Sequence, residues 1–214
     1  MGKKERERVL ILCSHADDEI ISMGGTIAKY VKERKKVKIV IFTSGEKSSP
    51  WLKEGVITRS RIKESEAASK LLGCKVEFLG IPDAKVKENL ELAAGEVKRI
   101  LREFNPHKIF THTKYDAHPD HRAVFYALEK ALNGRVRKPK IFTFMIWGLF
   151  NPNDSATFYV RTDDYFEDKI KALQVFKTQK LIVALFYLPM FIRDRLGGIR
   201  NKCKYAETFY VENA

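Results

Sequence analysis

Short apolar runs alternate with longer amphipathic segments along most of this 214-residue chain. Strand-like runs at residues 9–13, 37–42, 76–79, 108–111 and 141–146 are separated by helical patterns at residues 23–34, 58–72, 90–104 and 119–132. Strands that are apolar throughout are buried on both faces, as in a parallel sheet covered by helices. The alternation therefore predicts an α/β, three-layer Rossmann-like fold with a mostly parallel sheet and helices on both faces.

The C-terminal third is less regular. Residues 157–161 resemble a strand, residues 163–178 a helix, and residues 207–211 a last strand at the edge of the sheet. The sequence contains no linker that would separate a second domain, so we expect one domain over residues 1–214. The loop after the first strand is not G-x-G-x-x-G, and nothing in it indicates a dinucleotide site.

The chain carries a formal net charge of +13, with 40 Lys and Arg against 27 Asp and Glu. Such an excess suits an anionic partner. The basic residues are scattered, however, so we interpret them as ordinary surface charge and do not expect nucleic acid as a partner. Three cysteines without a C-x-x-C pair, and a charged N-terminus without a signal-peptide hydrophobic region, indicate the reducing cytoplasm.

The longest apolar run extends from Leu181 to Ile192 and contains Pro189. It is shorter than the roughly 17–25 residues that a transmembrane helix needs, so we expect no membrane span. We expect a buried helix, a subunit interface or a lid. The alternative is docking on a membrane surface through this run together with Arg193 and Arg195. Assembly of the chain into a homo-oligomer is a further alternative.

Four of the five histidines lie in two short segments that each follow a predicted strand. The first segment reads S-H-A-D-D-E at residues 14–19, and the second ends in H-P-D-H at residues 118–121. Ligands of open parallel sheets bind beyond the carboxyl ends of the strands, where both segments should meet. Either segment alone could simply start a helix, but together they predict a metal site.

The residue types suit a catalytic zinc ion, which commonly takes three His, Asp or Glu ligands and leaves a position for water. The adjacent Asp17 and Asp18 can serve two roles, because neighbouring side chains leave the backbone in different directions. Pro119 places His118 near a helix N-cap, where the helix dipole disfavours imidazolium and leaves the neutral ring that a metal requires.

Supporting roles at this site remain open from the residues alone. Asp116 or Asp120 could accept a ring N–H and fix a histidine tautomer. His112 either lines the pocket or supports it. We expect His107, which lies outside both segments, at the surface.

The two motifs resemble those of the LmbE-like, or PIG-L, family of zinc-dependent N-acetylglucosamine deacetylases. That family opens with A-H-P-D-D-E and later has H-P-D-H; here Ala16 replaces the proline of the first motif. Further matches are Gly24-Gly25-Thr26, Arg61-x-x-Glu64, the F-L-G-x-x-D segment at residues 78–83, Lys171-Ala172-Leu173, and Ala206-Glu207-x-Phe209. The resemblance spans nearly the whole chain.

The resemblance implies one zinc ion per chain, held by His15, Asp18 and His121, although other divalent metals suit the same ligands. It implies Asp17 as the general base. It also implies that His118 stabilises the oxyanion or protonates the leaving amine.

By the same resemblance, Asp120 orients His118 or a neighbour, and Arg61 and Asp83 contact the sugar. The implied activity is removal of the N-acetyl group from a small amino-sugar substrate that contains N-acetylglucosamine. Two alternatives stay open. One is a basic nucleic-acid- or membrane-surface-binding protein with a structural metal. The other is a metal-dependent hydrolase of another N-acyl amide.

Overall fold

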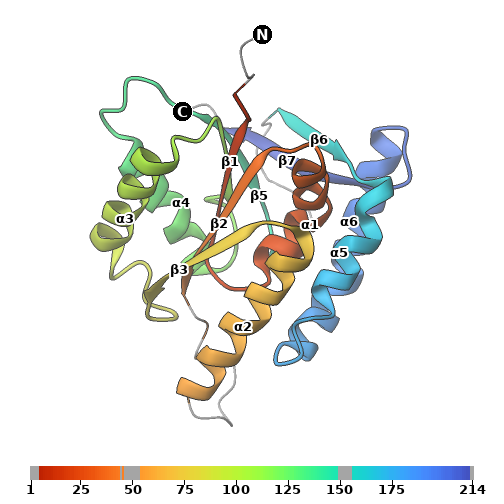
Figure 1. Cartoon of the computed structure of the whole chain (residues 1–214), viewed down its shortest axis with the longest axis horizontal. Coiled ribbons are helices and arrows are strands. Elements are labelled where there is room, and N and C mark those ends of the chain that lie inside the picture. Colours follow the sequence, from red (N-terminus) through yellow and green to blue (C-terminus); the bar gives the residue numbers. More distant parts are fainter. Residues whose placement is uncertain (1–4, 44, 46–53, 149–155, 213–214) are drawn as a thin grey trace.

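A computed structural model describes residues 5–43, 45, 54–148 and 156–212, apart from the side chains of residues 54–57 and 182. Its seven-stranded sheet has the order β3-β2-β1-β4-β5-β7-β6 (Figure 1). The strands are β1 (Arg8–Cys13), β2 (Lys36–Thr43), β3 (Lys75–Ile81), β4 (Lys108–His112), β5 (Lys140–Phe144), β6 (Thr157–Arg161) and β7 (Ala206–Glu212). The first five pair in parallel, and β7 pairs antiparallel with β5 and β6.

Helices cover both faces of the sheet, as the sequence predicts. The helices are α1 (Asp18–Lys32), α2 (Glu54–Leu72), α3 (Leu90–Phe104), α4 (Pro119–Leu132), α5 (Phe166–Leu173) and α6 (Lys180–Arg200), with a 3-10 turn, η2 (Asp163–Tyr165), before α5. One core packs α3 and α4 against β1, β2, β4 and β5. A second core packs α1, α2, α5 and α6 against the opposite face (Figure 1). The predicted three-layer α/β fold is confirmed.

Strand order places the functional segments together. The chain starts at β1 and moves to β2 and β3 on one side, then returns past β1 to β4 and β5 on the other. The carboxyl ends of β1 and β4 therefore flank the point where the direction of winding reverses, which is the usual ligand site of such sheets. Both histidine-containing segments follow these two strands.

Three sequence predictions differ from the structure. The first helix begins at Asp18 instead of residue 23. It consists of two helical halves joined at the non-helical Met23 (φ −149°, ψ 25°), and the sequence predicted only the second half. The helix predicted at residues 163–178 is η2 followed by α5, which already ends at Leu173. The last strand, β7, lies between β5 and β6, so the edge strand is β6.

The kink in α1 depends on a buried ionic cluster formed by later elements. Glu207 of β7 accepts hydrogen bonds from the backbone N–H groups of Gly25 (3.0 Å) and Thr26 (2.6 Å), which the kink leaves without helical partners. Lys169 of α5 bonds Glu207 (2.7 Å) and Asp194 of α6 (2.6 Å), and all three charged side chains are fully buried. The cluster therefore ties α1, which begins at Asp18, to the C-terminal elements.

Replacing Lys169 with methionine is expected to lower the free energy of unfolding by about 3–5 kcal/mol, because two buried carboxylates lose their cation. Denaturant-induced unfolding measures the change. Lys171→Met, on the exposed face of α5, is the matched control and should change stability little. Equal stability of the two variants would contradict a structural role for the cluster.

Among the described residues, no helix is both long enough and apolar enough to cross a membrane.

Candidate metal centre

The loop between β1 and α1 presents His15, Asp17 and Asp18 at the end of the sheet. His15 donates its backbone N–H to Asp18 Oδ2 (2.9 Å), which folds the loop around the Asp18 carboxylate. Asp17 has φ 113°, an unusual value for a non-glycine residue, and its backbone N–H donates to the Glu19 carboxylate (3.1 Å). The strained backbone sends the two adjacent aspartates in different directions.

The segment after β4 supplies His118 and His121 at the start of α4. His118 is the N-cap, and its Nδ1 accepts the backbone N–H of Asp120 (3.2 Å), with Pro119 in the first turn. The predicted N-cap position is confirmed. Because Nδ1 accepts this bond, a neutral His118 ring carries its proton on Nε2.

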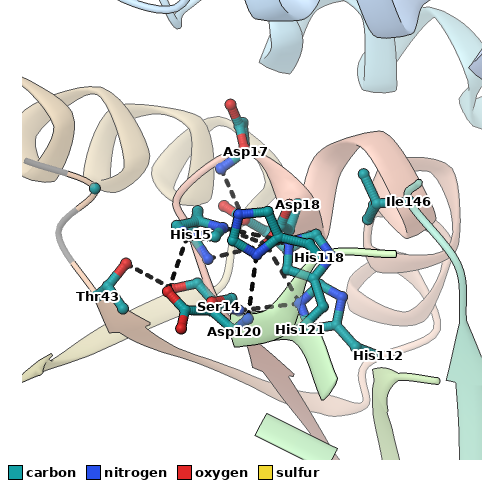
Figure 2. A network of polar contacts seen from close by, with 12 residues as sticks. Ser14, His15, Asp17, Asp18, Thr43, His112, His118, Asp120, His121 and Ile146 are labelled. Atoms are coloured by element: carbon teal, nitrogen blue, oxygen red, sulfur yellow. Dashed lines mark hydrogen bonds and ion pairs between the residues drawn. The ribbon is translucent and has the colours of Figure 1, made fainter. Parts of the chain in front are cut away.

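Side chains from the two segments converge on Asp18 (Figure 2). Asp18 Oδ2 lies 3.5 Å from His15 Nδ1 and 3.4 Å from His121 Nε2, and these two nitrogens are 3.3 Å apart. Three donor atoms thus form a nearly equilateral triangle. Tetrahedral zinc ligands at about 2.0–2.2 Å from the ion are separated by roughly 3.4 Å, so the triangle has the size that one metal ion requires.

Three other groups of three residues around this triangle also bring donor atoms within 4.8 Å of one another. These groups are His15 with His118 and His121, Asp18 with His112 and His121, and His15 with Asp83 and Asp120. His112 is a poor ligand, because its Nε2 accepts the backbone N–H of Ser14 (3.0 Å). Its ring stacks on His121 with centroids 3.9 Å apart, so His112 supports the site from behind.

Each histidine of the triangle has a carboxylate at its other ring nitrogen. His15 Nε2 lies 3.2 Å from Asp83 Oδ1, and His121 Nδ1 lies 3.0 Å from Asp116 Oδ1. Asp116 in turn accepts the backbone N–H groups of Ile146 (2.8 Å) and Trp147 (3.2 Å), which fixes its position. Carboxylates in this arrangement orient metal-binding imidazoles and set their tautomers.

Asp120 lies differently from Asp116. Its carboxylate accepts the backbone N–H groups of Ala84 (2.8 Å) and Val86 (3.3 Å), and one oxygen is 3.9 Å from His15 Nε2. Asp120 therefore holds the loop after β3 that carries Asp83, and only its backbone N–H contacts His118. Of the two residues that the sequence left as alternatives, Asp116 is the one beside His121.

Asp17 faces Arg61 instead of the triangle. Its Oδ2 lies 4.0 Å from Arg61 Nη2 and has no hydrogen-bond partner among the described residues, although the side chain is buried. Arg61 Nη1 also donates to the carbonyl oxygen of Gly45 (3.0 Å). Gly45 has φ +62°, and a Cβ there would overlap the guanidinium, so only glycine suits this position.

Burial and neighbouring charges separate the pKa values of these groups. Burial raises the pKa of Asp17, and the Arg61 charge opposes this only in part. Burial would also raise the pKa of Asp18, but His121 and His112 hold it well below its usual range. Adjacent carboxyl groups with opposite shifts are typical of sites where one group binds a cation and the other exchanges protons.

The histidines also differ in pKa. Burial lowers the pKa of His121 to about 4 and lowers that of His118, so both rings are neutral at pH 7. Burial acts in the same direction on His15, but hydrogen bonds to Asp18 and Asp83 outweigh it and raise the pKa to about 10. A cation bound here would compete with this proton for Nδ1, and its binding would release protons.

A cavity of about 290 Å³ opens beside the triangle. Polar walls come from the predicted residues, namely His15, Asp17, Asp18, Arg61, Asp83, His118 and His121. Apolar walls come from Ile21, Ala84, Ile146, Trp147 and Phe186, none of which the sequence analysis assigned to the site. Ile21 and Ala84 lie close to motif segments, whereas Ile146 and Trp147 follow β5 and Phe186 lies in α6. An apolar side chain at such a position gives no signal in the sequence that it will line a cavity.

His107, which we expected at the surface, lies at the other end of β4. Its side chain is half-buried, and its Nδ1 accepts the backbone N–H of Arg8 (3.0 Å). It has no part in the candidate metal centre.

Comparison with known proteins identifies relatives over the segments that form this site. Residues 10–132 match the family model described as PIG-L: GlcNAc-PI de-N-acetylase. A mycothiol S-conjugate amidase from Streptomyces coelicolor is 33% identical over 139 residues, covering 53% of this chain and 47% of that protein. A 1D-myo-inositol 2-acetamido-2-deoxy-alpha-D-glucopyranoside deacetylase from Thermobispora bispora is 32% identical over 143 residues, covering 53% of this chain and 47% of that protein.

The chain spans about half the length of these curated relatives. Among solved structures, an N,N'-diacetylchitobiose deacetylase from Pyrococcus horikoshii superposes with a TM-score of 0.83. The superposition covers 98% of this chain and 85% of the other at 24% sequence identity. At that identity the likeness establishes the fold.

Proposed function

Because the chain belongs to the PIG-L family, we propose that it is a metal-dependent hydrolase of an N-acetylglucosamine-containing substrate, releasing acetate and the free amino sugar. The observation that carries this proposal is the triangle of His15 Nδ1, Asp18 Oδ2 and His121 Nε2, with sides of 3.3–3.5 Å. These three residues would hold an ion from one side and would leave the cavity side to water and substrate.

The residues present fit a zinc ion. The proposed ligands are two histidines and one carboxylate, and Asp83 and Asp116 lie at the outer ring nitrogens of the histidines. Asp17 Oδ2 is a buried oxygen without a hydrogen-bond partner among the described residues, and it borders the same cavity. When bound, such an ion polarises a carbonyl group and makes hydroxide available near neutral pH.

Asp17 is the general base of the proposed reaction. Its raised pKa lets the carboxylate accept a proton from the attacking water near neutral pH and return it later to the departing amine. Arg61, 4.0 Å from Asp17 Oδ2, keeps enough of the carboxylate ionised to act. We therefore propose that Arg61 keeps Asp17 ionised, in addition to making the substrate contact that the family resemblance implies.

His118 stabilises the oxyanion that forms when the amide carbon becomes tetrahedral. The ring borders the cavity, and the Asp120 backbone N–H on Nδ1 leaves Nε2–H as the donor. Its lowered pKa favours this neutral donor over an imidazolium that would protonate the amine. Removing one such donor typically lowers kcat by about 10²–10³-fold.

Two aspartates have supporting roles in the proposal. Asp120 positions the His118 ring through its backbone N–H, and Asp83, at the cavity wall, is the proposed sugar contact.

Replacing Asp116 with asparagine is expected to weaken metal affinity by about 10–100-fold, because an amide holds the His121 tautomer less well. Competition with a chromophoric chelator measures the affinity. Asp168→Asn, on α5 and away from the site, is the control. Unchanged metal affinity in Asp116→Asn would show that Asp116 does not support the metal site.

The test of the proposed activity is acetate release from a panel of N-acetylglucosamine derivatives by the purified chain. We expect hydrolysis that stops when a chelator removes the metal and returns when zinc is added. A panel that also contains N-acyl amides without a sugar examines the second candidate function, which the amidase name of the Streptomyces relative favours. Chelator-insensitive hydrolysis, or retention on nucleic acid without any hydrolysis, would contradict the proposal.

The single-domain organisation over residues 1–214, the cytoplasmic location and the oligomeric state stay predictions. The small-molecule amino-sugar substrate is part of the proposal and agrees with the size of the cavity, which is at the small end of ligand pockets.

A further inference from the structure

Helix α6 presents an apolar face to the exterior. Six aliphatic side chains spaced three or four residues apart share this face, and we call them the α6 stripe: Leu181, Leu185, Leu188, Ile192, Leu196 and Ile199. Three of them, Leu181, Leu188 and Ile199, are 87%, 61% and 64% exposed. Surface helices normally turn such a stripe toward the core, so its exposure calls for an occupant.

The opposite face of α6 fixes this orientation. Phe186 and Met190 are buried in the core on this side of the sheet, and Asp194 bonds the buried Lys169. Gly197 packs so closely on β7 that a Cβ would lie 2.3 Å from the carbonyl oxygen of Ala206. The helix cannot rotate to bury the stripe without breaking these contacts.

The exposed charges of α6 and of the residues that flank it are positive, and one acidic neighbour, Glu64 of α2, accepts hydrogen bonds from Thr178 before the start of α6. Lys177 and Lys180 are exposed at one end of α6, and Arg200, Lys202 and Lys204 are exposed at the other. The only acidic residue in the α6 sequence is Asp194, which is buried. Arg193 and Arg195 are already bound to backbone carbonyl groups, so the cations at the helix ends are the ones free to meet an anionic surface.

We propose that the α6 stripe docks on the surface of a bilayer that contains anionic lipid, with α6 lying in the interface. An apolar face flanked by lysine and arginine is the pattern of interfacial helices, whose binding combines apolar burial with attraction to anionic headgroups. A second copy of the chain suits the face less well. Two stripes packed together would bring like charges at the helix ends close to each other.

The docked face adjoins the candidate metal centre. Phe186 of α6 contacts Trp147, with ring centroids 4.8 Å apart and planes at 83°, and both rings border the cavity. Trp147 is 45% exposed, so it reaches from the cavity wall to the exterior. Docking through α6 would hold the mouth of the cavity near the headgroups.

Vesicle flotation with the full chain tests the docking and needs no enzymatic activity, so its failure is separate from failure of the proposed function. We expect the chain to float with phosphatidylcholine vesicles that contain about a third phosphatidylserine, and to bind pure phosphatidylcholine weakly. Leu181→Gln/Leu188→Gln should reduce the partition coefficient at least about tenfold, since each leucine contributes apolar burial. Both positions are exposed, so folding is preserved.

The matched control is Leu71→Gln/Leu92→Gln, which replaces two exposed leucines of α2 and α3 and should leave flotation unchanged. Lys180→Gln/Arg200→Gln should reduce binding to anionic vesicles about fivefold or more per charge, and added salt should reduce binding of the parent chain.

Sedimentation of the same proteins without lipid shows whether the α6 stripe instead binds a second copy of the chain. The proposal is overturned if the stripe variants bind vesicles like the parent. It is also overturned if the parent fails to bind anionic vesicles, or if Leu181→Gln/Leu188→Gln converts a dimer to a monomer.

Discussion

Asp17→Asn is expected to lower kcat by about 10²–10⁴-fold while metal content stays at the level of the parent chain. The Asp17 carboxylate faces Arg61 at 4.0 Å, whereas the proposed ligands form a separate triangle, so the substitution removes the proton acceptor and leaves the donor atoms in place. Asparagine has nearly the same shape. Steady-state acetate release and metal analysis of the same preparations give the two quantities.

The pH dependence supplies a second readout for Asp17. Burial raises the pKa of this carboxyl, so the acid limb of kcat/KM should lie above the usual range of an aspartate and disappear in Asp17→Asn. Asp164→Asn, which alters an exposed aspartate of η2, serves as the control and should keep both rate and profile. Parent-like turnover in Asp17→Asn would exclude Asp17 as the base.

His121→Ala is expected to abolish metal-dependent turnover. It should also reduce metal affinity by more than the roughly 10–100-fold that is typical when a carboxylate beside a metal-binding histidine is lost. His121 Nε2 lies 3.4 Å from Asp18 and 3.3 Å from His15, so its loss opens one corner of the triangle. Metal analysis after dialysis, followed by zinc titration of activity, measures the effect.

His107→Ala is the matched control for His121→Ala. His107 lies at the other end of β4 and contacts only the backbone of Arg8 among the hydrogen bonds described for its ring. We expect this variant to retain metal and turnover. A His121→Ala protein with full metal occupancy would show that another set of donors, such as one that includes His118, holds the ion.

The central sheet could be predicted from the sequence because its strands are buried on both faces. The apolar residues of β1 and β2, for example, are almost fully buried, so a continuous apolar run was a reliable signal. Since parallel strands end at the same edge, the same reasoning brought the residues after β1 and β4 together.

The break in α1 could not be predicted from local sequence. Its N–H groups are satisfied by Glu207, more than 180 residues away along the chain, and Gly24 packs on the side chain of Lys169. The position of β7 inside the sheet also depends on long-range antiparallel pairing. Local periodicity contains no information on either contact.

The side chains that support the proposed metal ligands were only partly predictable from the sequence. Asp116 and Asp120 are both near the histidines in sequence, and only the fold shows that Asp116 faces His121 while Asp120 bonds the loop after β3. Of the alternatives that the sequence left for the run Leu181–Ile192, a buried helix is wrong, because α6 exposes the stripe. An apolar run indicates a helix face, but the direction of that face is set by Phe186, Met190 and Asp194 on the other side.

The most direct measurement for the central claim is anomalous X-ray diffraction at the zinc edge from crystals of the chain grown with zinc. The account predicts one strong peak within bonding distance of His15 Nδ1, Asp18 Oδ2 and His121 Nε2. A structure with zinc present in which these three atoms share no peak would contradict it.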